Sequence, residues 1–331
     1  MLSDSQLSAI EPGPFEELAQ AIRSRTYKES YYSLIASYMD ESFDMQPRGV
    51  FAVGGFLGRG VPIFELERRW EQLRKRPDIN IAYFKASECE HGRGEFAKFV
   101  QDPENISLAE RSKLDSISHE FLKLIVNPVA FDNKRYFIVH GVGIVQEDFY
   151  EVIKEPRAKA ILGHNPYRLA YDFAMIQCAW AMKRLEEFIV EDNLTRMSDK
   201  SSREYVSFVC DEHEKYSPLA HEAYRNLKET NPNAADYMAT FTSGDEKKLE
   251  SLQAADAAVF EVRRVLNLVF KQWPGKVRKQ FNLLRGTVMF LITHSTKDQL
   301  LHIVNTHSPG EPFKLDSLMN TEFNENIALM I

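Results

Sequence analysis

The sequence is poor in cysteine, and its cysteines form no recognisable pattern. Only Cys89, Cys178 and Cys210 are present, far apart and without a CxxC pair. This argues against a disulfide framework and against a zinc site built from cysteines. The first residues, MLSDSQLSAIEPGPFEEL, also lack the basic start and apolar run of a signal peptide. We therefore expect a protein of the reducing cytoplasm.

Long apolar runs, phosphate-loop glycines and an excess of basic charge are also missing. No stretch approaches the ~18 apolar residues of a membrane span, so no membrane partner is expected. Val53-Gly54-Gly55 is a glycine pair within a strand, not a phosphate loop. The net charge of −7 argues against a surface covered with basic residues for nucleic-acid binding. A local basic groove could still bind phosphates.

What the sequence does contain is a mixed succession of strands and helices. Hydrophobic spacing predicts strands at 31–39, 50–58, 80–87, 135–145, 204–210 and 287–294. It predicts helices at 61–76, 106–126, 165–189, 216–230, 243–272 and 297–304. The helix from 243 is expected to open with a capping box, Ser243-x-x-Glu246.

This order predicts one α/β domain with a mixed sheet flanked by helices on both faces. We expect it to span 31–275, after a helical N-terminal extension at 1–30. An α/β C-terminal addition at 276–331 is expected to pack on the same domain.

Four acidic residues occupy positions that surface exposure explains poorly. Asp40, Glu88 and Asp211 each end an apolar predicted strand, and Asp256 borders the buried stripe of the helix LQAADAAVF. Unpaired carboxylates near a core are costly, so a positive charge should lie among them. Oxygen ligands of this kind select Mg²⁺ or Mn²⁺, and two such ions can promote hydrolysis of a phosphodiester.

Each acid also has a simpler explanation. A single Asp at a strand end commonly caps the following turn. Asp256 could instead pair with Arg263 or Arg264, although those spacings suit direct contact poorly. It is the set of four that favours a metal site.

The same segments resemble the domain-of-unknown-function 3800 family, whose members are predicted ribonuclease H-like nucleases. The matching pieces, in chain order, are YMDES (38–42) with FAVGGF (51–56), FKASE (84–88), FVCDE (208–212) and LQAADAAV (252–259). The resemblance covers roughly 31–270. It implies a ribonuclease H-like fold and assigns the metal-binding roles to Asp40, Glu88, Asp211 and Asp256. Phe43 stands where the family often has glycine, and Gln253 matches a family glutamine.

The resemblance and the short hairpin loop together predict the strand arrangement. The strands 31–39, 50–58 and 80–87 are expected to form an antiparallel meander. The strand 204–210 should pair on the other side of 31–39.

Several neighbours are secondary candidates. Glu41 and Glu212 each follow a proposed ligand, but adjacent strand residues point to opposite faces, which favours exposure for both. Lys85 could face a scissile phosphate or line a solvated strand edge. His213 could reach the mouth of the site, whereas His140 fits a hydrogen-bonded strand histidine better than a general base.

We therefore expect a phosphodiesterase that uses Mg²⁺ or Mn²⁺ and a water nucleophile to hydrolyse nucleic acid. The alternative is a catalytically silent ribonuclease H-like module that binds nucleic acid or a protein. Response to a divalent ion would distinguish the two.

Overall fold

The computed structural model describes residues 35–43, 49–127, 136–191, 205–270, 276–287, 289–311 and 313. The predicted N-terminal extension lies outside these ranges. The strands are β1 (Ile35–Ser42), β2 (Val50–Arg59), β3 (Ile138–Val145), β4 (Val206–Asp211), β5 (Met238–Gly244) and β6 (Met289–Ser295). The helices are α3 (Gly60–Arg74), α4 (Ala86–His91), η2 (Gly94–Phe99), α5 (Leu108–Val126), α6 (Gln146–Val152), α7 (Pro156–Leu162), α8 (Pro166–Glu191), α9 (Ser217–Thr230), α10 (Pro232–Ala235), α11 (Glu250–Phe270), α12 (Lys279–Leu284) and α13 (Lys297–Thr306).

The strands join in one mixed sheet with the order β5-β4-β1-β2-β3-β6. The hairpin of β1 and β2 is antiparallel, as predicted, and β3 continues it antiparallel to β2. On the other side of β1 lies β4, parallel to it, which confirms the predicted position of the 204–210 strand. Outside these, β5 is parallel to β4 and β6 is parallel to β3.

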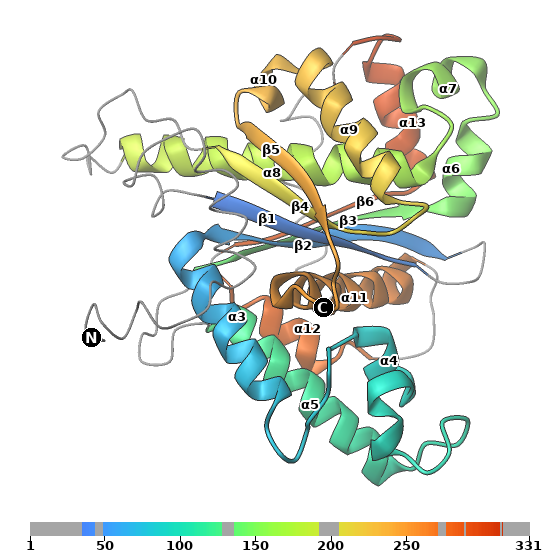
Figure 1. The fold of residues 1–331 in the computed structure, drawn as a ribbon. Coiled ribbons are helices and arrows are strands. Elements are labelled where there is room, and N and C mark those ends of the chain that lie inside the picture. The colour runs from blue at the N-terminus through green and yellow to red at the C-terminus, as the bar shows by residue number, and fades with distance from the viewer. Residues whose placement is uncertain are drawn as a thin grey trace.

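Helices cover both faces of the sheet (Figure 1). Because successive strand residues point to opposite sides, Ile35 and Met39 join the core under α8, whereas Ala36 and Tyr38 join the core over α11 and α3. Both faces are therefore buried. This explains why the central strands are nearly continuous apolar runs. Among the described residues, no helix combines the length and apolar character needed to cross a membrane.

The predicted strand at 80–87 is wrong. This segment is irregular up to Lys85, and α4 begins at Ala86. Its backbone amides are taken by side chains: Phe84 N donates to Gln253 Oε1 at 2.9 Å, and Ala86 N donates to Asp256 Oδ2 at 2.6 Å. With these donors occupied, the segment cannot pair with a neighbouring strand along that edge. The third strand of the meander is β3 instead.

The predicted capping box at Ser243 is also wrong. Ser243 lies in β5, which sequence analysis missed, and α11 begins only at Glu250. An edge strand that is only partly buried, MATFTSG, lacks the strong alternation that reveals a strand.

Helix α11 packs closely against β3, which presents glycines to it. A Cβ atom on Gly141 would lie 2.8 Å from Cγ1 of Val262, and one on Gly143 would lie 2.3 Å from Cδ1 of Leu266. Both distances are too short for a real contact. The glycines therefore allow the short separation between α11 and β3, and this separation helps to position Asp256.

We expect Gly141→Ala to lower the free energy of unfolding by about 1–3 kcal/mol, because the added methyl group overpacks this interface. Urea denaturation would measure the change. The same substitution should cost less in a Val262→Ala background, where the γ carbons that it meets are gone. An equal cost in both backgrounds would contradict this account of the close approach.

Candidate metal centre

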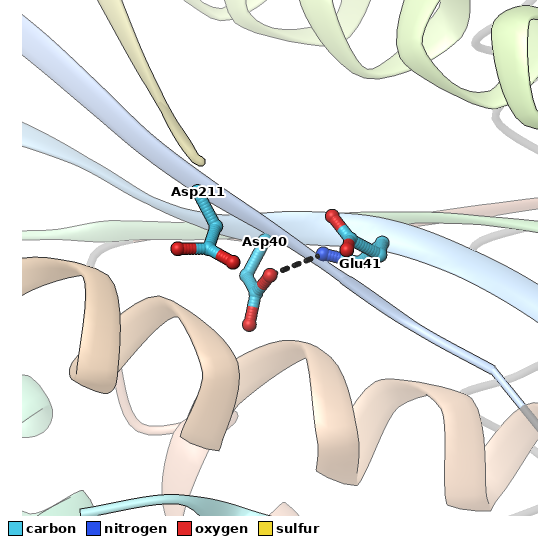
Figure 2. Close-up of side chains that lie close together, drawn as sticks. All are labelled: Asp40, Glu41 and Asp211. Atoms are coloured by element: carbon cyan, nitrogen blue, oxygen red, sulfur yellow. Dashed lines mark hydrogen bonds between the residues drawn. The ribbon is translucent and has the colours of Figure 1, made fainter. Parts of the chain in front are cut away.

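Two aspartates lie side by side where the central parallel strands end. Met39 of β1 pairs with Cys210 of β4, so the next residues, Asp40 and Asp211, follow at the same level. Each lies two residues beyond a side chain that packs in the core over α11, namely Tyr38 and Val209. Alternation therefore directs both carboxylates to the α11 face, as Figure 2 shows.

Glu41 completes this group from the other side of the strand. Its carboxylate accepts a hydrogen bond from Tyr171 Oη of α8 at 2.9 Å, and its backbone N–H donates to Asp40 Oδ1 at 2.8 Å. One carboxylate oxygen from each of Asp40, Glu41 and Asp211 lies within 4.8 Å of the others. These three buried carboxylates could hold a metal ion. The expectation that Glu41 is exposed is wrong, because only 8% of it is accessible.

Asp256 approaches the same place from α11. Its Oδ2 accepts the hydrogen bond from Ala86 N at the first residue of α4, so it caps that helix. Its charge also raises the pKa of Asp40, and the charges of both carboxylates raise the pKa of Lys85. Asp256 therefore caps α4 and also acts on the charges of the centre, whereas Arg264 pairs with Glu90 at 2.6 Å.

Lys85 supplies the positive charge among these acids. Its ammonium lies 2.5 Å from Glu246 Oε1. Burial lowers the pKa of Lys85, but the charges of Asp256, Asp40 and Glu246 together outweigh burial and raise it. Lys85 is thus held as a cation. It lines the acidic group, not a solvated strand edge.

Glu246 is a buried acid of the centre that the sequence analysis did not place there. It is buried, its backbone N–H donates to Asp211 Oδ1 at 3.1 Å, and its side chain pairs with Lys85. The sequence spacing assigned Glu246 to a helix cap, which does not form. Glu246 lies near the acids because it follows β5, which is parallel to β4 and ends opposite Asp211.

Gln253 fixes the segment that carries Lys85. Its Oε1 accepts from Trp70 Nε1 at 3.0 Å and from Phe84 N, and its Nε2 donates to the Glu246 carbonyl at 2.9 Å. Every polar group of this fully buried amide is used. Gln253 is therefore a positioning residue that holds Lys85 and Glu246 against α11.

Glu88 is engaged elsewhere. It lies on α4, and its carboxylate accepts from Tyr83 Oη at 2.9 Å and from Glu95 N at 3.2 Å. The group of Asp40, Glu41 and Asp211 does not include it. The sequence placed Glu88 at the end of a strand that does not form, which explains the difference.

The remaining candidates lie outside the carboxylate group. Glu212 is exposed, as expected. His213 accepts from Lys215 N through Nδ1 at 3.1 Å and lies beside Tyr216. His140 is buried within β3 with Nε2 3.0 Å from Ser37 Oγ, and burial lowers its pKa to about 4. His140 is thus a hydrogen-bonded strand histidine.

Arg278, one of the basic residues that follow α11, is engaged in ion pairs. Its guanidinium pairs with Glu90 at 2.6 Å and with Asp115 at 2.9 Å. These ion pairs join α12 to α4 and α5.

The acids of the centre resist ionisation. Burial, followed by the charges of Glu41 and Asp256, raises the pKa of Asp40 well above its usual range. Burial likewise raises the pKa of Glu41 to about 7 and that of Asp256 to about 6. Oδ2 of Asp40 is buried and accepts no hydrogen bond. A buried carboxylate oxygen without a hydrogen bond is unfavourable when it is ionised, so the site favours a bound cation or a proton.

No family model, curated protein or solved structure matches this chain. The chemistry of the centre therefore rests on its own geometry.

The raised pKa values predict how stability depends on pH without metal. A carboxyl group whose pKa is raised by folding keeps its proton in the folded protein at pH values where the unfolded chain has released it. The folded protein therefore has its full stability near pH 4 and loses stability as the pH rises through 6 and 7. Asp40→Asn removes one of these charges. In a chelating buffer, the variant should gain stability over the parent at pH 8 and less at pH 5.

Thermal melting at both pH values would measure the difference. Each pKa unit corresponds to about 1.4 kcal/mol. A variant that is less stable than the parent at pH 8 would show that the Asp40 carboxylate forms a favourable contact in its ionised state.

Proposed function

We propose that this protein is a metal-dependent phosphodiesterase that hydrolyses nucleic acid at Asp40, Glu41, Asp211 and Asp256. The observation that carries the proposal is the pair Asp40 and Asp211, side by side at the ends of adjacent parallel strands, with Asp256 on the helix that crosses the same face. The strand order supports a ribonuclease H-like assignment, because an antiparallel meander begins at β1 and β4 pairs with its other side.

The residues fit a hard divalent ion. All the side-chain donors at the centre are carboxylate oxygens, which suit Mg²⁺ or Mn²⁺ better than zinc. The unsatisfied Oδ2 of Asp40 is a ligand atom without a partner. Two carboxylates about 4 Å apart repel by roughly 4 kcal/mol at an effective dielectric of 20, and a divalent ion would relieve this repulsion.

Each residue then has a defined task. Asp40, Glu41 and Asp211 would hold the ion, Tyr171 orients the Glu41 carboxylate, and Asp256 adds a ligand from α11. When bound, the metal lowers the pKa of a water molecule and stabilises the leaving oxygen. Water would be the nucleophile, and no side chain would be modified.

The ammonium of Lys85 has a different role in each of two candidate functions. In the enzyme, its ammonium balances the acids before metal binds and lies close to where a phosphate would be hydrolysed. In a catalytically silent module, the same ammonium is the permanent counter-ion of the acids, in place of metal. The 2.5 Å contact with Glu246 is the observation that favours this second function.

Divalent ions should separate the two functions. Mn²⁺ at about 100 times its dissociation constant should stabilise the parent by about 2.7 kcal/mol, a rise in melting temperature of roughly 5 °C. Asp211→Asn should lose most of this rise and lower hydrolysis of a mixed oligonucleotide by more than about 100-fold.

Glu212→Gln is the matched control, because it removes an adjacent but exposed carboxylate. It should keep both the Mn²⁺ response and the hydrolysis. The absence of any Mn²⁺ response in the parent would reject the metal centre and leave the silent module.

Lys85→Met tests the role of the ammonium directly. In a chelating buffer, this variant should melt lower than the parent, since the buried acids lose their counter-charge. Mn²⁺ should restore the lost stability and should bind the variant more tightly than the parent, because a competing cation is gone. Calorimetric titration would measure the affinity, and weaker Mn²⁺ binding by the variant would contradict the competition.

A further inference from the structure

A cavity of about 240 Å³ lies among α7, α8, α9 and the segment that follows α13. These helices cover the face of the sheet opposite α11 (Figure 1), whereas Asp40 and Asp211 point toward α11. The cavity is therefore separate from the carboxylate centre. Its volume suits an organic molecule smaller than most drug-sized ligands.

Asp172 lines this cavity from α8 although only 6% of the residue is accessible. Its Oδ1 is buried and accepts no hydrogen bond. Its Oδ2 lies 3.6 Å from Nε of Arg168, which is too long for a hydrogen bond. A buried carboxylate is unfavourable unless it is paired and hydrogen-bonded. Because Asp172 lines the cavity, a molecule held there can supply a donor to this carboxylate.

Arg168 does not balance the acids around the cavity. Its Nη1 donates to Glu222 of α9 at 2.7 Å, and its Nε has no hydrogen-bond partner. The guanidinium is thus shared between Glu222 and Asp172. Glu311, an exposed acid, lines the cavity as well. Three acids around one guanidinium leave an excess of negative charge, which favours a cation in the cavity and opposes an anion.

The rest of the wall is apolar and already in place. It consists of Ile161, Leu162, Leu227 and Phe313. The ring of Phe313 packs on Phe173 of α8 with their centroids 5.2 Å apart, and Asn231 Nδ2 donates to the Phe313 carbonyl at 2.9 Å. A wall that is held without a ligand loses little conformational freedom when one binds.

We propose that this cavity binds a small organic cation, an alkylammonium ion whose N–H groups donate to Asp172 and whose carbon chain packs on the apolar wall. An ammonium group offers three donors and no acceptor, which matches a carboxylate without a donor of its own. A hydrogen bond between two charged groups is about twice as strong as a neutral one. This inference does not depend on the proposed hydrolysis.

Saturation-transfer NMR with the full chain tests the site in a buffer free of divalent ions. The probe is n-butylammonium. Asp172→Asn keeps the size of the side chain but removes its charge, and it should weaken binding by about 10-fold to 150-fold, the range for a hydrogen bond to a charged group. Tetramethylammonium has the same charge without an N–H donor and should compete poorly with the probe.

Two further variants separate the cavity from general electrostatic attraction. Glu229→Gln is the matched control, because Glu229 is an exposed acid of α9 that does not line the cavity, and it should leave the affinity unchanged. Asn226→Phe fills the cavity from α9 while Asp172 stays intact, and it should abolish binding. Melting curves establish that each variant folds, and Asn226→Phe provides the test if Asp172→Asn does not.

Binding should also depend on pH. Burial, opposed by the charge of Arg168 and aided by that of Glu222, raises the pKa of Asp172 to about 7. His164 and Glu311 also line the cavity. An alkylammonium ion keeps its proton in this range, as lysine does, so the affinity should rise by up to about 10-fold from pH 6 to pH 8 as Asp172 ionises. Asp172→Asn should lose this rise, whereas a change caused by His164 would persist in that variant.

Three results would overturn the proposal: equal affinity in Asp172→Asn and the parent, an equal loss in Glu229→Gln, or competition by tetramethylammonium as strong as that by the probe itself. Any of them would leave the cavity to water alone. Because no metal is present, the outcome is also independent of the carboxylate centre. An absent Mn²⁺ response would reject the hydrolase and not the amine site, and the reverse holds for an absent response to n-butylammonium.

Discussion

Mutual repulsion among buried carboxylates is the constraint on which this structure depends. Asp40, Glu41, Asp211, Glu246 and Asp256 are all buried, and Lys85 is the ammonium placed among them. One positive charge cannot balance five ionised acids. Burial, with the neighbouring acidic charges adding to it, raises the pKa values of Asp40, Glu41, Asp211 and Asp256, so that protons are retained until another cation arrives. A globular protein seldom maintains such a group without a use for it.

The scaffold around the acids is correspondingly rigid. The side chains of Gln253 and Asp256 bind the backbone amides on either side of Lys85, and the glycines of β3 let α11 lie against the sheet. These contacts fix the ammonium and the carboxylates relative to one another. Because side chains on helices and strands are held more firmly than those on loops, the geometry suits a site that must bind an ion at defined distances.

Sequence reasoning predicted those parts of the structure that local pattern determines. Continuous apolar runs identified β1, β2 and β4. The short loop predicted the hairpin, and the family resemblance predicted that β4 pairs with the other side of β1. The acids Asp40, Asp211 and Asp256 were found because each interrupts an apolar segment. The segment 80–87 was wrongly predicted to be a strand, since IAYFKAS is apolar enough for one but two of its amides are bound by side chains from α11. Such a long-range contact leaves no periodic signal. Glu41 was expected to be exposed because it points to the opposite face from Asp40, but α8 buries that face as well. Glu246 was assigned to a helix cap because β5 was not recognised.

The hydrogen bond that fixes the segment of Lys85 has a consequence for how the chain is made. It joins Ala86 to Asp256, which are 170 residues apart in sequence. During synthesis the hairpin of β1 and β2 emerges early. The segment that carries Lys85 cannot be fixed beside the acids of β1 until Asp256 of α11 has left the ribosome. Contacts of such separation form late because the intervening loop must first close. The nascent chain therefore passes most of its synthesis with an incomplete centre.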